Sequence, residues 1–116
     1  MQKTLVASGA ALGGLAVILG AFAAHGLKSK LAPSMLEVFH TGVEYQFYHA
    51  LALLAAGILG SRWAGICFII RIVLFSGSLY AMSALNAPLG IVTPIGGLFF
   101  IAGWILLLIK VIKKDN

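Results

Sequence analysis

Charged residues are scarce in this sequence. Only 9% of its 116 residues are charged and 61% are hydrophobic, whereas a soluble globular chain is typically about a quarter charged and about half apolar. No polar stretch is longer than a short loop, which leaves no room for a separate domain outside a membrane. We therefore expect the lipid bilayer to be the main environment of this chain.

Cysteine and acidic residues are also rare. The single cysteine, Cys67, excludes both an intrachain disulfide and a cysteine-rich metal site. Eight Lys and Arg against three Asp and Glu give a net charge of +5, which could in principle indicate a nucleic-acid partner. These cations are scattered among the ends of apolar runs and do not alternate with exposed aromatic residues. We expect no nucleic-acid partner and attribute the cations to the membrane surface.

Four apolar runs are each long enough to cross a bilayer, which takes about 20 residues for roughly 30 Å of hydrocarbon. They cover residues 5–24, 36–59, 63–85 and 93–110. The sequence thus predicts an all-α, integral membrane four-helix bundle that forms one domain over residues 1–116. A competing interpretation treats the first run as a secretory signal peptide, because Ala21-Phe22-Ala23 resembles a cleavage site. The run is longer than the apolar core of most signals, about 7 to 15 residues, which favours a retained span.

Capping and turn residues predict where the helices begin and end. Ser34 and Glu37 have the spacing of a capping box, directly after Pro33, and predict the start of the second helix. Gly60-Ser61 should end that helix, and the turn formers at 86–90 should end the third. Thr93, followed by a proline, resembles an N-cap and predicts the start of the fourth helix.

Small residues follow a helical spacing in the first span. Glycine or alanine at every third or fourth position lies on one face and lets a neighbouring helix approach closely. The residues assigned to helix packing are Gly9, Gly13, Ala16, Gly20, Gly96, Gly97 and Gly103. Such a stripe is also consistent with a homo-oligomer.

The cations favour one orientation in the membrane, because positively charged residues beside short loops stay in the cytoplasm. One side of the predicted bundle carries Lys3, Arg62, Lys110, Lys113 and Lys114, and the other carries only Lys28 and Lys30. Five cations against two predict that both termini are cytoplasmic.

Glu44 and Arg71 lie inside predicted spans, where an ionisable side chain is costly and usually faces the bundle interior or a wet cavity. A hairpin of the second and third helices about Arg62 brings polar residues of the two helices to the same depth. The pairs are Tyr80 with Glu44, Ser78 with Gln46, and Ser76 with Tyr48. The expected partner of Arg71 is either His49, one turn away, or the cytoplasmic lipid headgroups.

Glu37, His40, Glu44 and Tyr48 are spaced three or four residues apart and share one helix face. Glu44 could exchange protons or bind a cation there, near His40. The alternative is structural: Glu37 caps the helix, His40 lies in the interface, and Glu44 is satisfied by Tyr80 and other donors. The structural interpretation is the one we favour.

Metal and cofactor motifs are weak. E-x-x-H occurs once, at Glu37 and His40, whereas a carboxylate-bridged di-iron bundle carries it twice together with two further glutamates. A single metal ion held by His25, His40 and either Glu44 or Glu37 is geometrically conceivable but is not predicted. No catalytic triad, Walker or dinucleotide-binding arrangement is present, so we expect no cofactor and no catalytic residues.

Four motifs occur in order along the chain: GAFAAHGLK at 20–28, TGVEYQFYHAL at 41–51, FSGSLY at 75–80, and TPIGG at 93–97 together with Gly103-Trp104. In these motifs the chain resembles the small bacterial inner-membrane proteins of the family called domain of unknown function 423. This family includes YgdD-like and YwdK-like proteins and is related to transmembrane protein 256 of animals. One difference lies in the first motif, where this chain has Ala23 and the family's G-A-F-G-A-H-G run has glycine. The resemblance covers the whole chain and implies a four-helix inner-membrane protein with no established activity.

The resemblance also implies a shared polar core. Together with the residues singled out above, the predicted polar seam or ligand site comprises His25, His40, Glu44, Tyr45, Gln46, His49, Arg71, Ser76, Ser78, Tyr80 and Thr93. We expect a non-enzymatic protein that associates with lipid, with another membrane protein or with further copies of itself. The alternatives are a minimal oligomeric transporter or channel for protons, ions or a small solute, and an enzyme acting on a lipid or quinone with His25 or His49 as base.

Overall fold

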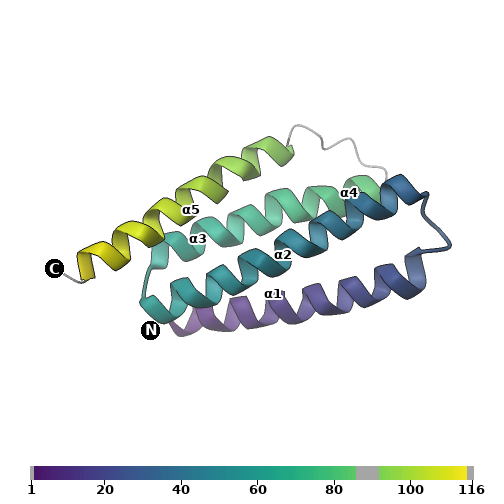
Figure 1. The fold of residues 1–116 in the computed structure, drawn as a ribbon. Helices are drawn as coiled ribbons and strands as arrows, with labels where there is room; N and C mark the ends of the chain where they lie inside the picture. The colour runs from purple at the N-terminus through teal and green to yellow at the C-terminus, as the bar shows by residue number, and fades with distance from the viewer. Residues whose placement is uncertain (1, 86–91, 115–116) are drawn as a thin grey trace.

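The computed structural model describes residues 2–85 and 92–114, and in the last helix it describes the side chains of 98–113. These residues form four helical rods (Figure 1). The rods are α1 (Lys3–Phe22) with the π-helical turn η1 (Ala23–Leu27); α2 (Pro33–Leu59); α3 (Arg62–Arg71), the π-helical turn η2 (Ile72–Ser76) and α4 (Gly77–Leu85) in line; and α5 (Val92–Lys114). The described part contains no strand, so the prediction of an all-α, four-helix protein is confirmed.

The outer surface of the rods is apolar. The segments Lys3–Leu27 and Arg62–Leu85 are long and apolar enough to cross a membrane. Val17 and Ile18 of α1 and Ile101 of α5 are all more than half exposed, although they are large hydrophobic residues. Such exposure is unfavourable in water and is suited to a lipid environment.

The four rods lie side by side in chain order and form a flattened bundle. α1 packs against α2, α2 against the rod of α3 and α4, and that rod against α5, whereas the described parts of α1 and α5 do not touch (Figure 1). The molecule measures 53 × 27 × 17 Å along its principal axes. Each inner rod is therefore covered along two edges, and its remaining faces are open to the surroundings.

Two apolar clusters lie toward the two ends of the rods. At the end where the termini lie, Leu5, Leu53 and Phe68 belong to a buried cluster to which Leu107 of α5 also contributes. At the other end, Ala23, Leu27 and Phe39 form a smaller cluster. Most of the buried polar residues come from the stretch of α2 between these clusters and from the rod beside it.

The start of α2 differs from the prediction. The helix begins at Pro33, Ala32 occupies the N-cap position, and no side chain makes a capping hydrogen bond, so the Ser34 and Glu37 capping box is wrong. Proline is well suited to the first helical turn because its φ is already helical and its missing N–H has no acceptor there. Ser34 thus falls inside the helix, where its hydroxyl is no longer in the capping position.

The other helix ends follow from local chemistry. α2 ends at Gly60, whose φ of 77° is left-handed, and the Ser61 amide donates to the Ala56 carbonyl over 2.8 Å. Glycine adopts this conformation without the strain of a Cβ. The predicted turn at 86–90 and the predicted capping side chain of Thr93 lie outside the described residues.

The small residues of the first span face α2 within the same chain. A Cβ on Gly9 would lie 3.0 Å from the carbonyl oxygen of Ala50, one on Gly13 would lie 3.7 Å from the Ala50 Cβ, and one on Gly20 would lie 3.4 Å from a Val43 methyl. Ala16 is buried on the same face. Because α2 already occupies this stripe, the stripe no longer argues for a homo-oligomer. On α5, Gly103 packs against Phe68, and the contacts of Gly96 and Gly97 lie outside the described residues.

Candidate functional site

Gln46 joins three of the four rods. Its amide nitrogen donates to the Leu12 carbonyl of α1 over 2.8 Å, and its amide oxygen accepts from the Tyr80 hydroxyl of α4 at 2.6 Å. Only 2% of the Gln46 side chain is exposed. A buried amide needs such partners because an unsatisfied polar group inside an apolar bundle is costly. Gln46 and Tyr80 therefore fix the relative positions of α1, α2 and α4.

Ser76 makes a second polar link between rods. Its hydroxyl donates to the Gly42 carbonyl of α2 over 2.8 Å. A Cβ at Gly42 would lie 2.7 Å from the Tyr80 ring, so glycine lets the two rods approach at this level. Ser76 is the last residue of the π-helical turn η2, whose extra residue alters the register of this rod relative to a regular α-helix.

The predicted depth matching is correct in placing a polar contact between these two rods and wrong in two of its pairs, those of Tyr80 and Ser76. Tyr80 bonds to Gln46 instead of Glu44, and Ser76 bonds to Gly42 instead of lying beside Tyr48. The two observed pairs deviate from the predicted depth in opposite directions along α2, by two residues for Tyr80 and by six for Ser76, so no single shift of the hairpin turn accounts for both. Ser78 is hydrogen-bonded to the Phe75 carbonyl of its own rod.

Arg71 lies in an aromatic cage, which we define as Tyr45, Phe75 and Phe100. The guanidinium carbon is 3.6 Å from the centroid of the Phe75 ring, 4.9 Å from that of Phe100 and 5.8 Å from that of Tyr45. The residue is 6% exposed, and its Nε is buried without a hydrogen-bond partner among the described residues. These residues show no hydrogen bond between Arg71 and His49, and the guanidinium instead makes cation–π contacts with the three rings.

His49 is the second buried residue with an unsatisfied nitrogen. Its Nδ1 lies 2.7 Å from the Tyr45 carbonyl oxygen, while Nε2 is buried and has no partner in the part of the chain that the structure describes. A carbonyl only accepts, so Nδ1 carries the proton, and Nε2 of the neutral ring is an acceptor. The ring centroid of His49 is 4.7 Å from that of Phe100 and 6.3 Å from that of Tyr45, two of the rings that surround Arg71.

The other predicted site residues are not brought together. His25 is exposed in η1, His40 is half-buried, and Glu44 is exposed on α2. The part of the chain that the structure describes contains no group of three His, Cys, Asp or Glu residues able to hold a metal ion. The conceivable metal site of His25, His40 and a glutamate therefore does not form, and Thr93 cannot be assessed because its side chain lies outside the described residues.

Some residues of the site carry no sequence signal. Phe75 and Phe100 form part of the cage, and Leu12 and Gly42 contribute only carbonyl oxygens. A phenylalanine in an apolar span is ordinary, and every residue has a carbonyl group. Only the pairing of helices, which the sequence does not specify to within a turn, identifies these groups.

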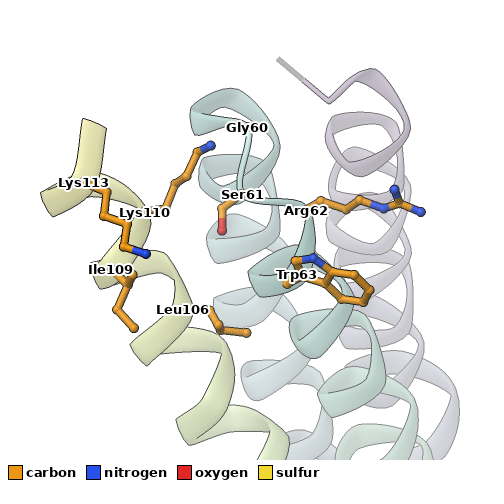
Figure 2. A pocket seen from close by; sticks show the side chains of 8 residues that line it. All are labelled: Gly60, Ser61, Arg62, Trp63, Leu106, Ile109, Lys110 and Lys113. Carbon is orange, nitrogen blue, oxygen red and sulfur yellow. The ribbon is translucent and has the colours of Figure 1, made fainter. Parts of the chain in front are cut away.

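A pocket also lies at the end of the bundle where the chain termini lie. It has a volume of about 240 Å³ and is formed between the turn from α2 to α3 and the last turns of α5 (Figure 2). Its lining residues are Gly60, Ser61, Arg62, Trp63, Leu106, Ile109, Lys110 and Lys113. A second pocket of about 370 Å³ at the same end lies between the start of α1 and α3. Gln46, His49 and Arg71 line neither of these two pockets.

Comparison with known proteins identifies the family. The family model described as a protein of unknown function (DUF423) matches residues 19–97. The chain belongs to this family.

Relatives of the family are similar over nearly the whole chain. The UPF0382 membrane protein YwdK of Bacillus subtilis is 42% identical over 97% of this chain and 98% of its own length. The UPF0382 membrane protein SH2409 of Staphylococcus haemolyticus is 41% identical with the same coverage. The UPF0382 inner membrane protein YgdD of Escherichia coli is 38% identical over 84% of this chain and 80% of its own length. No solved structure gives a significant match.

The resemblance drawn from the sequence motifs is thus confirmed, and so is the membrane environment. The names of the relatives describe membrane proteins of an uncharacterised family, and two helical segments of this chain, Lys3–Leu27 and Arg62–Leu85, are long and apolar enough to cross a membrane. Membership of this family therefore identifies the chain as a membrane protein and assigns it no molecular activity.

Proposed function

We propose that this chain is a multi-pass protein of the bacterial inner membrane, with both termini in the cytoplasm, that acts without catalysis by associating with another membrane protein. The observation that carries the proposal is the exposure of Glu44 on an uncovered face of α2. We call this face, formed by Glu37, Glu44, Tyr48, Leu51 and Ile58, the open face of α2. All five residues are exposed, and their spacing of three, four or seven places them on one side of the helix.

Glu44 lies well inside the predicted span. Val43 is level with Gly20 of α1, since a Cβ on Gly20 would lie 3.4 Å from a Val43 methyl. Gly20 precedes Lys28, the first cation of the outer side, by eight residues, which is about 12 Å at 1.5 Å per residue. An acidic side chain facing lipid near the centre of a span costs about 2.5 to 3.5 kcal/mol. A partner helix with a hydroxyl, amide or cationic donor opposite Glu44 removes much of that cost.

The rest of the open face is suited to a protein partner. Tyr48 is 55% exposed, and Leu51 and Ile58 follow it along the helix with similar exposure. Aromatic and large apolar residues around one polar group are typical of the centre of a protein interface. The occupant is either a different membrane protein or a second copy of this chain, and the mass of a cross-linked product distinguishes the two.

The gathering of cations supports the orientation. Arg62, Lys110 and Lys113 line one pocket at the end of the bundle where both termini lie (Figures 1 and 2), and Lys3 is near this end at the start of α1. Lys28 and Lys30 lie at the opposite end. The positive-inside rule then places the end with more cations in the cytoplasm.

Site-specific photo-cross-linking in native membranes tests the proposal. A photoreactive residue in place of Leu51 should give a protein adduct, and that adduct should decrease strongly when Glu44 is changed to Leu. The matched control is the same photoreactive residue in place of Ile18, which is 65% exposed on α1, where we expect adducts with lipid alone. Lipid adducts alone at both positions, or a protein adduct that does not depend on Glu44, would contradict the proposal.

Flux measurements address the transport alternative. Liposomes containing the wild type, His49→Ala or Glu44→Gln should all show the proton and ion leak of empty liposomes. A flux above leak that is lost in either variant would favour a transporter and overturn the role proposed here.

A further inference from the structure

We infer that Arg71 and His49 form a binding site for a hydroxyl-bearing phosphate group, carried into the membrane by an acidic phospholipid. This site is separate from the open face of α2 and does not depend on the partner protein proposed above. It rests on two buried polar side chains from different rods, each with a nitrogen that has no hydrogen-bond partner within residues 2–85 and the side chains of 98–113.

Arg71 has no counter-charge within the described chain. The sequence holds three acidic residues, and the two in the described part, Glu37 and Glu44, are both exposed on α2 and form no ion pair with Arg71. Arg71 is only 6% exposed. A buried guanidinium without an anion carries a desolvation cost of several kcal/mol, and each cation–π contact offsets only about 0.5 to 2 kcal/mol of it. An external anion removes this imbalance.

The position of Arg71 shows that the anion must enter the bundle. Arg71 follows Arg62, the first residue of α3, by nine residues, which corresponds to about 14 Å along the helix axis. The guanidinium lies over Phe75, one turn further from that end. Helical side chains normally point back toward the N-terminus of their helix, which here would be the cytoplasmic surface. Arg71 therefore points away from the headgroup layer that would otherwise satisfy it.

His49 adds a requirement for a hydrogen-bond donor on the ligand. Its Nδ1 donates to the Tyr45 carbonyl, so the neutral ring presents Nε2 as an acceptor, and none of the described residues is a partner of this atom. Both His49 and Arg71 lie against the rings of Tyr45 and Phe100. A ligand that satisfies both side chains needs an oxyanion for the forked donors of Arg71 and a hydroxyl for Nε2.

A phosphate with an attached or neighbouring hydroxyl meets both requirements. Phosphatidylglycerol carries an anionic phosphodiester and glycerol hydroxyls, and dihydrogen phosphate carries the same two kinds of group. The aromatic cage and the depth of the site favour the lipid, because its acyl chains can remain in the bilayer while its headgroup enters. α5 packs against α3 and η2 and makes few contacts with α2 or α4, so α5 is the rod that has to move least against the rest of the bundle to admit a headgroup.

Native mass spectrometry of the delipidated protein tests the site. We expect the wild type to retain one phosphatidylglycerol with an affinity at least about tenfold above that for phosphatidylcholine, which is the effect of one charge-assisted hydrogen bond. Arg71→Leu should abolish this preference. Arg71→Lys, which keeps the charge and loses the fork, should weaken it. The matched control is Arg62→Leu on the same rod, which removes an exposed arginine and should leave the preference unchanged.

Two further ligands separate the contributions of the groups and the source of the phosphate. Phosphatidylethanol has the oxyanion without the hydroxyls, so the wild type should prefer phosphatidylglycerol to it, and His49→Leu should remove that preference. Inorganic phosphate should not displace the lipid; displacement at low concentration would assign the site to a free anion. Circular dichroism establishes that each variant is folded, and Arg71→Lys gives the result if Arg71→Leu does not fold. Equal retention of phosphatidylglycerol by wild type and Arg71→Lys and Arg71→Leu, or no preference over phosphatidylcholine in the wild type, would overturn the inference.

Discussion

The contact between α1 and α2 gives the sharpest prediction about stability. A Cβ on Gly9 would lie 3.0 Å from the Ala50 carbonyl oxygen and 3.0 Å from the Leu54 amide nitrogen, both backbone atoms of α2. A Cβ on Gly14 would have no atom within 4 Å apart from its own helix. The substitutions Gly9→Ala and Gly14→Ala thus place the same methyl group on the same helix, once against a neighbour and once in open surroundings.

Two opposing effects determine how much each substitution changes the free energy of unfolding. Ordinary contacts begin at about 3.4 Å, so Gly9→Ala forces the two helices apart by a few tenths of an ångström, and overpacking of this kind typically costs about 1 to 3 kcal/mol. Alanine regains at most about 1 kcal/mol through its higher helix propensity. We expect Gly9→Ala to lower the free energy of unfolding by up to about 2 kcal/mol and Gly14→Ala to leave it unchanged or raise it by up to about 1 kcal/mol, so that the two variants differ by about 1 to 3 kcal/mol.

Unfolding of the purified protein in mixed micelles by increasing dodecyl sulfate, followed by circular dichroism, measures both values. The difference between the two variants removes effects of composition and helix propensity that they share. If Gly9→Ala and Gly14→Ala unfold within about 0.3 kcal/mol of each other, within the scatter of independent sites, then the close approach of α1 to α2 does not exist in the membrane.

Three other predictions concern the seam, a turn and the topology. Tyr80→Phe removes the hydroxyl that donates to Gln46 and should lower the free energy of unfolding by about 0.6 to 1.7 kcal/mol. Tyr48→Phe, at an exposed tyrosine of α2, should have no effect in the same titration, and equal effects of the two variants would contradict the bridging role of Gln46. Gly60 has a φ of 77°, and a Cβ added there would have no neighbouring atom within 4 Å. Gly60→Ala should therefore lower the free energy of unfolding by about 1 to 2 kcal/mol through backbone strain alone, and an unchanged stability would contradict the left-handed turn. In a cysteine-free background, Ser29→Cys should react with a membrane-impermeant maleimide on intact spheroplasts and Lys113→Cys only after permeabilisation; the reverse pattern would invert the proposed orientation.

The sequence predicts the helical rods well because burial in lipid leaves the backbone few alternatives. Without water, each span must satisfy its own amides and carbonyls, so an apolar run of sufficient length is already a helix. The end of α2 at Gly60 follows from the conformational freedom of glycine. The capping box fails for a local reason, since Pro33 starts the helix before Ser34 and Glu37 can cap it.

The site is less predictable because it depends on register between helices. Gln46, Ser76 and Tyr80 stand out as polar residues in apolar spans, yet their partners are two carbonyl groups and one another. The amino-acid composition of Ile72–Ser76 does not predict a π-helical turn, yet this turn changes which side chains of the rod face α2. Arg71 is conspicuous in the sequence, whereas the rings that surround it come from residues 4 and 29 positions further along the chain and from α2.

The chain-order arrangement of the rods has a consequence for biosynthesis. Because each rod packs mainly on the one made just before it, the first hairpin can complete its extensive interface while the rest of the chain is still being synthesised. The third rod then packs against α2 of the completed hairpin, and α5 packs last against the third rod, with no contact between the described parts of α5 and α1. Such a protein never has to hold an early segment unpaired until the final one arrives, which limits the time during which Gln46 or Arg71 is exposed to acyl chains.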